Sequence, residues 1–194
     1  MAVDTDMRSA PLVVAIAGSL RDQSTTRLAL EHALDASAEA GARTELVDLR
    51  EWDLPLFDPD DRDRGDAAAL KSLIAEADAV LMGTPVYHGM ISSALKNAFD
   101  YLGKDEFGDT TVGLLTTAGG GSYAQTLEHL RTGVRTVHGW TLPHEVGIRS
   151  ASSKFDEDGA FTEPDIERRV RKLGTMAVEY AAIEPSTIEP PVTN

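Results

Sequence analysis

Hydroxyl side chains and one arginine crowd a short segment directly before a stretch with the pattern of a helix. Segment 18–26 reads Gly-Ser-Leu-Arg-Asp-Gln-Ser-Thr-Thr. Glycine permits a tight turn, and the first turn of a helix offers unpaired N–H groups and the positive end of its dipole. Hydroxyl groups and a guanidinium group both bind phosphate oxygens. We therefore expect a phosphate site formed by Ser19, Arg21, Ser24, Thr25 and Thr26.

A simpler alternative is that Ser24 or Thr25 only caps the helix, as many helices require. That alternative does not explain Arg21 beside so many hydroxyl groups. The segment is neither a P-loop, which needs Gly-Lys-Ser/Thr, nor a GxGxxG dinucleotide fingerprint.

A second loop, 84–90, reads Thr-Pro-Val-Tyr-His-Gly-Met and follows another apolar run. Pro85 and Gly89 predict a turn that presents Tyr87 and His88. An aromatic side chain in that place can lie against a planar ring. Taken alone, Tyr87 is better explained as a half-buried loop anchor and His88 as an ordinary surface residue.

A third loop, 116–122, reads Thr-Thr-Ala-Gly-Gly-Gly-Ser. Consecutive glycines let the backbone approach a ligand closely, although they also make a flexible turn. If all three loops follow strands of one parallel sheet, they meet at the same edge. Together they predict a site for a molecule with a phosphate at one end and a flat ring at the other.

Strand-like and helix-like stretches alternate along the chain. The run Leu12–Ala17, bounded by Pro11 and Gly18, is typical of a strand buried on both faces. The other predicted strands are 44–49, 79–84, 111–117 and 141–148, and the predicted helices are 24–40, 67–76, 92–102, 123–137 and 164–182. This alternation predicts an α/β fold with a five-stranded parallel sheet and helices on both faces.

The length and composition fit one domain. The chain has 194 residues, 42% of them hydrophobic, which is enough for a single core. We expect residues 1–183 to form one domain. The segment 184–194 has little apolar content, so we expect a disordered tail there.

Acidity is the unusual feature of the composition. The formal net charge is −14, which disfavours nucleic acid and anionic membranes as partners. Few lysines and many acids fit a salt-rich cytoplasm, although an ordinary acidic protein is the simpler interpretation. The chain has no cysteine, and its five histidines lack metal-ligand spacing, so we expect no disulfide and no metal site. The first residues lack the basic start of a signal peptide, which predicts a cytoplasmic protein.

Four motifs together resemble the NADPH-dependent FMN reductase family, which includes FMN, quinone, azo-dye and chromate reductases. They are Ala-Gly-Ser-Leu-Arg at 17–21, Leu-Pro-Leu-Phe-Asp at 54–58, Thr-Pro-Val-Tyr-His-Gly at 84–89 and Leu-Lys-Asn-Ala-Phe-Asp at 95–100. The resemblance implies a flavodoxin-like three-layer sandwich with strand order 2-1-3-4-5.

The resemblance also implies roles for single residues. Ser19, Arg21, Ser24 and Thr26 would take the FMN phosphate. The isoalloxazine would lie beside Pro85, Val86, Tyr87 and His88, with Thr117, Gly119 and Gly120 at its other polar edge. Two positions depart from the family, since Thr26 and His88 stand where asparagine is common.

The function implied is electron transfer from NADPH, or NADH, through bound FMN to a small acceptor such as a flavin or quinone. The flavin would carry the chemistry, so no side chain is expected to act as acid, base or nucleophile. The family further suggests a homodimer or homotetramer. A flavodoxin-type electron carrier and a non-enzymatic flavin sensor are the alternatives from other functional classes.

Overall fold

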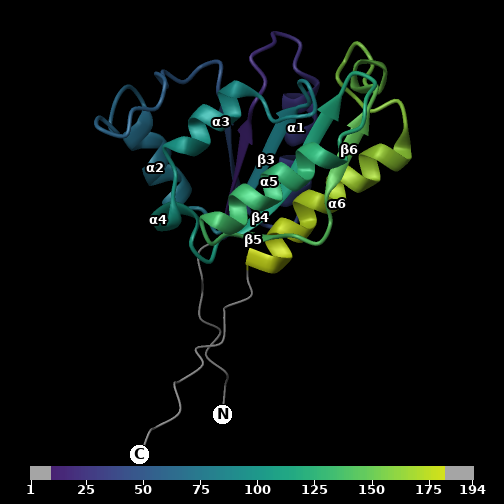
Figure 1. Ribbon diagram of the computed structural model, residues 1–194. Coiled ribbons are helices and arrows are strands. Elements are labelled where there is room, and N and C mark those ends of the chain that lie inside the picture. The colour runs from purple at the N-terminus through teal and green to yellow at the C-terminus, as the bar shows by residue number, and fades with distance from the viewer. Residues whose placement is uncertain (1–9, 182–194) are drawn as a thin grey trace, which may run out of the picture.

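A computed structural model describes residues 10–181 of the protein. Six strands form one sheet, and helices cover both of its faces (Figure 1). The strands are β1 (Leu12–Ala17), β2 (Arg43–Asp48), β3 (Ala79–Pro85), β4 (Thr111–Ala118), β5 (Trp140–Thr141) and β6 (Val146–Arg149). The helices are α1 (Thr25–Glu39), α2 (Ala67–Ala75), α3 (Ser93–Asp100), α4 (Lys104–Phe107), α5 (Ala124–Thr136) and α6 (Pro164–Ala181).

All strand pairs are parallel, and the order β2-β1-β3-β4-β5 confirms the order that the family resemblance implied. The register places the carboxyl ends of β1, β3 and β4 side by side, with Ala17 opposite Gly83 and Pro85 opposite Thr117. The three loops singled out from the sequence therefore begin at one edge of the sheet.

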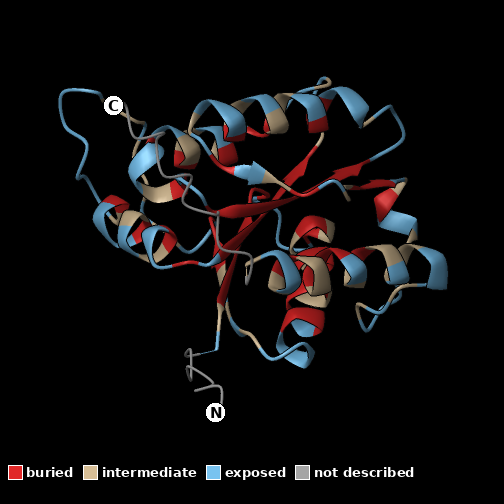
Figure 2. Cartoon of the chain, turned by 90° about the horizontal axis from the view of Figure 1, so that it is seen from below, coloured by how far each residue is buried: buried red, intermediate tan, exposed pale blue. Residues whose placement is uncertain are grey.

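The central strands are buried on both faces because alternate side chains pack into two separate cores (Figure 2). In β1, Val14 and Ile16 face a core shared with α3 and α5, while Val13 and Ala15 face α1 and α6. Continuous apolar runs in these strands are thus a direct consequence of the layered architecture.

Helices α1 and α6 approach unusually closely where Gly174 faces α1. A Cβ atom at Gly174 would lie 1.9 Å from the carbonyl oxygen of Ala33. The Ser37 hydroxyl donates to the Gly174 carbonyl at 3.0 Å across the same contact. This contact fixes α1, whose N-terminus points toward the carboxyl edge of the sheet.

The predicted fifth strand, 141–148, is divided in the structure into β5 and β6, and both pair with β4. Thr141 pairs with Val112 and Val146 with Leu115, so the chain uses two more residues than β4 between these pairs. Pro143 lies in this interval and has no N–H to continue the ladder. The single-turn helix α4 was also not predicted from the sequence.

The predicted tail 184–194 and the end of the predicted domain at 183 lie outside the described residues. Among residues 10–181, no helix combines the length and the apolar composition that crossing a membrane requires.

Candidate functional site

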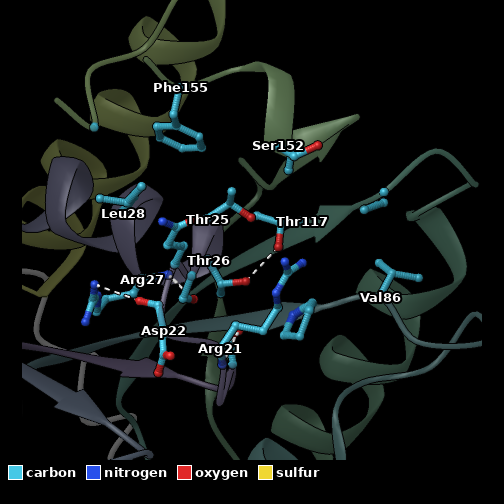
Figure 3. A pocket seen from close by; sticks show the side chains of 18 of the residues that line it. Arg21, Asp22, Thr25, Thr26, Arg27, Leu28, Val86, Thr117, Ser152 and Phe155 are labelled. Carbon is cyan, nitrogen blue, oxygen red and sulfur yellow. Dashed lines mark hydrogen bonds between the residues drawn. The ribbon is translucent and has the colours of Figure 1, made fainter. Parts of the chain in front are cut away.

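A cavity of about 850 Å³ opens at the carboxyl edge of the sheet. Its walls come from the loops after β1, β3, β4 and β6 and from the first turns of α1 (Figure 3). This volume is in the range of sites that hold small organic ligands and cofactors. The edge is also where open parallel sheets bind their ligands.

The first wall is the loop from Gly18 into α1. The Ser24 side chain accepts a hydrogen bond from the Arg27 N–H at 3.1 Å, so it does cap the helix. The N–H groups of Thr25 and Thr26 have no hydrogen-bond partner among the described residues. Capping and ligand binding are therefore compatible, because one cap leaves other donors of the first turn free.

Arg21 supplies the charge of this wall. The nearby carboxylate of Asp22 pairs with Arg50 at 2.6 Å, and that of Asp48 pairs with Arg27 at 3.4 Å. No carboxylate of the described residues forms an ion pair with Arg21, whose side chain is exposed at the cavity. Its guanidinium group is available to an anion beside the start of α1.

The first loop is held in place by α3, a contact that the sequence analysis missed. The Ser92 hydroxyl donates to the Gly18 carbonyl at 2.6 Å and accepts from the Leu95 N–H at 3.1 Å. The Thr84 hydroxyl accepts from the Ser92 N–H at 2.9 Å. Serine at this position looks like an ordinary helix cap in the sequence, and only the fold shows that it also orients the neighbouring loop.

Two of the four family motifs contact each other. The Asn97 amide donates to the carbonyls of Leu54 and Pro55 at 3.1 and 2.9 Å, and its oxygen accepts from the Phe57 N–H at 2.8 Å. The Tyr101 hydroxyl also donates to the Pro55 carbonyl. Motif 95–100 on α3 therefore fixes motif 54–58 in the loop after β2.

The loop after β3 forms a two-residue turn. Tyr87 and Met90 exchange backbone hydrogen bonds, while His88 and Gly89 have φ of 52° and 76°. Positive φ at both central residues defines a type I′ turn, which favours asparagine and glycine. The family's asparagine at the position of His88 thus fits a backbone requirement, and histidine is one of the residues that tolerates this conformation.

The structure brings most of the predicted site residues together. Ser19, Arg21, Ser24, Thr25, Thr26, Pro85, Val86, Tyr87, Thr117 and Gly119 line the cavity. His88 and Gly120 do not line it: His88 is exposed at the tip of its turn, and Gly120 follows the lining residue Gly119. The hydroxyl groups of Thr26 and Thr117 lie 2.6 Å apart and join the first wall to the end of β4 (Figure 3).

The fourth wall was not predicted. After β6 the chain runs through Ala151 and Ser152 into a small hairpin in which Phe155 pairs with Phe161. Residues 155–159 line the cavity and carry three acidic side chains. The sequence does contain features that could have predicted this wall. A loop after the last strand of a parallel sheet lies at the same edge as the other loops, and Asp-Gly at 158–159 is typical of a turn.

His32 ties this hairpin to α1. Its Nε2 lies 2.9 Å from the Gly159 carbonyl oxygen, and its ring packs against Phe161 with ring centroids 4.8 Å apart. The hairpin is therefore a fixed part of the cavity wall. In the part of the chain that the structure describes, no group of three His, Asp or Glu side chains is arranged as metal ligands.

The model of the NADPH-dependent FMN reductase family matches residues 11–153, which include three walls of the cavity and Ala151 and Ser152 of the fourth. The chain belongs to this family. It is an FMN-dependent NAD(P)H oxidoreductase, and the resemblance found in the four motifs is confirmed.

Curated relatives of this reductase agree with the assignment. It is 31% identical over 175 residues to an NADPH azoreductase of Bacillus sp. (strain OY1-2), covering 89% of this chain and 96% of the relative. It is 37% identical over 102 residues to an FMN-dependent NADPH-azoreductase of Staphylococcus aureus, covering 53% of this chain and 54% of that protein.

Solved structures share the fold of this reductase. The apo form of the NADH:FMN oxidoreductase EMOB superposes with a TM-score of 0.73 at 20% identity, over 92% of this chain and 94% of that one. The NAD(P)H:acceptor oxidoreductase FerB from Paracoccus denitrificans gives a TM-score of 0.73 at 22% identity, over 89% of this chain and 97% of that one. At these identities the likeness shows the flavodoxin-like fold alone.

Proposed function

We propose that the cavity binds FMN with its phosphate at the start of α1. The observation that carries this proposal is the Arg21 guanidinium, which has no ion-pair partner among residues 10–181, beside the N–H groups of Thr25 and Thr26, which have no hydrogen-bond partner there. The hydroxyl groups of Ser19 and Ser24 lie in the same wall. A dianionic phosphate satisfies all of these donors at once, and the helix dipole favours its charge.

The ring of FMN then lies between the loops after β3 and β4. Pro85, Val86 and Tyr87 border one side of the cavity, and Thr117 and Gly119 the other. When bound, FMN supplies a ring that takes two electrons from reduced nicotinamide and delivers them to an acceptor. His88 and Gly120 support their loops in this arrangement, because neither lines the cavity.

The acceptor is a small, flat, conjugated molecule of the azo or quinone type. The azoreductase names of two relatives support this class. Tyr87 is exposed beside the cavity and Met90 is exposed just after it, so an apolar ring has side chains to lie against. These side chains orient the acceptor and exclude water from one of its faces.

A visible spectrum of the purified protein tests this function, followed by rapid mixing with NADPH and with NADH. A flavin spectrum that bleaches on mixing, and continuous NADPH oxidation when an azo dye or a quinone is added, are expected. A protein that takes up FMN but turns over no small acceptor would instead be an electron carrier. Failure to bind FMN would refute the site.

We further propose a homodimer or homotetramer acting in the cytoplasm, where its nicotinamide donor is found. Large exposed apolar side chains in the loops at the carboxyl edge support association there, namely Leu20, Leu56, Tyr87 and Met90. Light scattering measures the assembly directly. A monomer at micromolar concentration would contradict this proposal and leave the FMN site unaffected.

The net charge of −14 supports adaptation to a salt-rich cytoplasm. Salt of about 1 M shortens the Debye length to about 3 Å, against about 10 Å at 0.1 M. Relief of repulsion among the acids, and between the protein and its anionic ligands, should raise thermal stability and FMN retention. A KCl titration followed by flavin fluorescence and by unfolding measures both, and flat stability with falling affinity would contradict salt adaptation.

A further inference from the structure

Arg149 ends β6 at the rim of the cavity. It pairs in the sheet with Ala118, and Ser150, with φ of 51°, turns the chain directly afterwards. Ala118, which lies opposite Arg149 in β4, and Ala151, two residues further along the chain, both line the cavity. The backbone of Arg149 is therefore placed by the sheet beside the opening, although the family resemblance assigned this residue no role.

The side chain of Arg149 has spare binding capacity. Its Nε donates to the Gly120 carbonyl at 3.0 Å, in the loop that carries the lining residue Gly119. The residue is exposed, and no carboxylate of the described residues forms an ion pair with it. A guanidinium group has five N–H donors, so most of them remain available to a ligand.

The charges around the cavity leave few places for a second anionic ligand. Arg27 is engaged by Asp48 and by Glu31 at 3.5 Å, and Arg21 is assigned to the FMN phosphate. The hairpin wall carries Asp156, Glu157 and Asp158, which repel phosphate. A nicotinamide dinucleotide brings phosphate groups to this acidic opening, and they require a cation.

We propose that Arg149 binds a phosphate group of the incoming nicotinamide dinucleotide and so directs its nicotinamide ring toward the cavity. This role rests on the proposed FMN site, because it concerns the electron donor of that site. A planar guanidinium group held at one nitrogen by the Gly120 carbonyl presents its other edge as a fork for phosphate oxygens. The same hydrogen bond places the phosphate contact next to the loop that borders the FMN ring.

The competing role for Arg149 is to hold the loop after β4, which contains Gly119, Gly120 and Gly121 and is called the glycine loop below. The hydrogen bond to Gly120 alone would give it that role, and loss of the loop's position would impair every electron donor equally. A donor without phosphate separates the two roles. N-benzyl-dihydronicotinamide carries the reacting ring and no phosphate, so a phosphate contact cannot affect it.

The test compares Arg149→Gln with Arg135→Gln as a charge-matched control. Arg135 is exposed at the end of α5, near β5 and away from the cavity, so its replacement removes the same charge. With one quinone acceptor, saturating FMN and low salt, Arg149→Gln should lower kcat/KM for NADPH roughly 10-fold, the loss of one charged hydrogen-bond pair. The rate with N-benzyl-dihydronicotinamide should stay within about twofold, and Arg149→Lys should recover part of the NADPH rate.

Equal losses with NADPH and with N-benzyl-dihydronicotinamide would show that Arg149 only holds the loop and would overturn the inference. An unchanged kcat/KM for NADPH would overturn it as well. A comparison of NADPH with NADH identifies which phosphate group Arg149 contacts. A loss of kcat/KM confined to NADPH indicates the 2′-phosphate, and equal losses for NADPH and NADH indicate the pyrophosphate. If the unmodified protein oxidises neither NADPH nor N-benzyl-dihydronicotinamide, the proposed function itself fails.

Discussion

Two glycine-containing loops border the same cavity, and glycine serves a different purpose in each. A Cβ atom at Gly18 would lie 2.7 Å from the Leu95 Cβ and 2.9 Å from the Gly83 carbonyl oxygen. At Gly119, Gly120 and Gly121 a Cβ atom would meet nothing within 4 Å. The first glycine allows close packing, and the other three lie in open space.

This difference indicates how the site is organised. The loop after β1 is fixed by the hydrogen bond from the Gly18 N–H to the Gly83 carbonyl and by Ser92, so the donors that we propose for the phosphate are held before a ligand arrives. The loop after β4 has Arg149 as a side-chain contact and can adjust to a ring. Fixed donors lower the cost of ordering a ligand, and an adaptable edge tolerates different electron acceptors.

The largest effect is expected for Gly18→Ala. The added methyl group meets a rigid Cβ atom and a backbone carbonyl, so the loop must shift, at a cost of about 1–3 kcal/mol in folding stability. The displaced donors should weaken FMN binding by on the order of 100-fold. Urea unfolding and FMN titration measure these effects, with Gly121→Ala as the control, because Gly121 is equally open and does not line the cavity. Equal stability of the two variants would contradict the packing argument.

Arg21→Ala tests the charge of the fixed loop without disturbing its backbone. Loss of a charged hydrogen bond worth about 1.5–3 kcal/mol should reduce FMN affinity roughly 10- to 100-fold. The apoprotein should unfold at the same urea concentration, because Arg21 is exposed and makes no ion pair among the described residues. Arg135→Ala removes the same charge far from the cavity and should keep FMN affinity. Unchanged affinity in Arg21→Ala would exclude this phosphate site.

Thr26→Val tests the contact that joins the two loops. The Thr117 hydroxyl loses its partner at 2.6 Å and stays buried, which should cost about 1–3 kcal/mol in stability. Thr126 is the matched control, since its buried hydroxyl has no hydrogen-bond partner among the described residues. Thr126→Val should be neutral or stabilising by about 1 kcal/mol. A loss of thermal stability in Thr26→Val that Thr126→Val does not show would support the contact, and equal losses in both variants would argue against it.

The smallest effect is expected for Gly120→Ala. Its backbone lies outside the left-handed region and its Cβ position is open, so alanine fits and reduces the freedom of the unfolded chain. Stability should stay constant or rise by about 0.4–1 kcal/mol, with FMN affinity within about twofold. Gly89→Ala, with φ of 76°, should be destabilised instead. A large loss in Gly120→Ala would show that the glycine loop also depends on close packing.

Most of the fold and much of the site could be predicted because they depend on local sequence. Continuous apolar runs such as Leu12–Ala17 predicted buried parallel strands, and the parallel arrangement placed three loops at one edge. The predicted helix start at Pro164 is confirmed. The division of 141–148 into two strands was missed, because it depends on how Pro143 and its neighbours fit along β4.

The sequence by itself determined the alternation of strands and helices, the family, the cofactor and three of the four walls of the cavity, because these follow from periodicity, glycine and hydroxyl spacing, and local motifs. Only the tertiary structure decided which contacts hold the site: Ser92 on Gly18, Asn97 on the loop after β2, and His32 on the hairpin wall. Their partners lie far away along the chain, and no local pattern specifies such a pair. Arg149 was missed for the same reason, because its position follows from the pairing of β6 with β4.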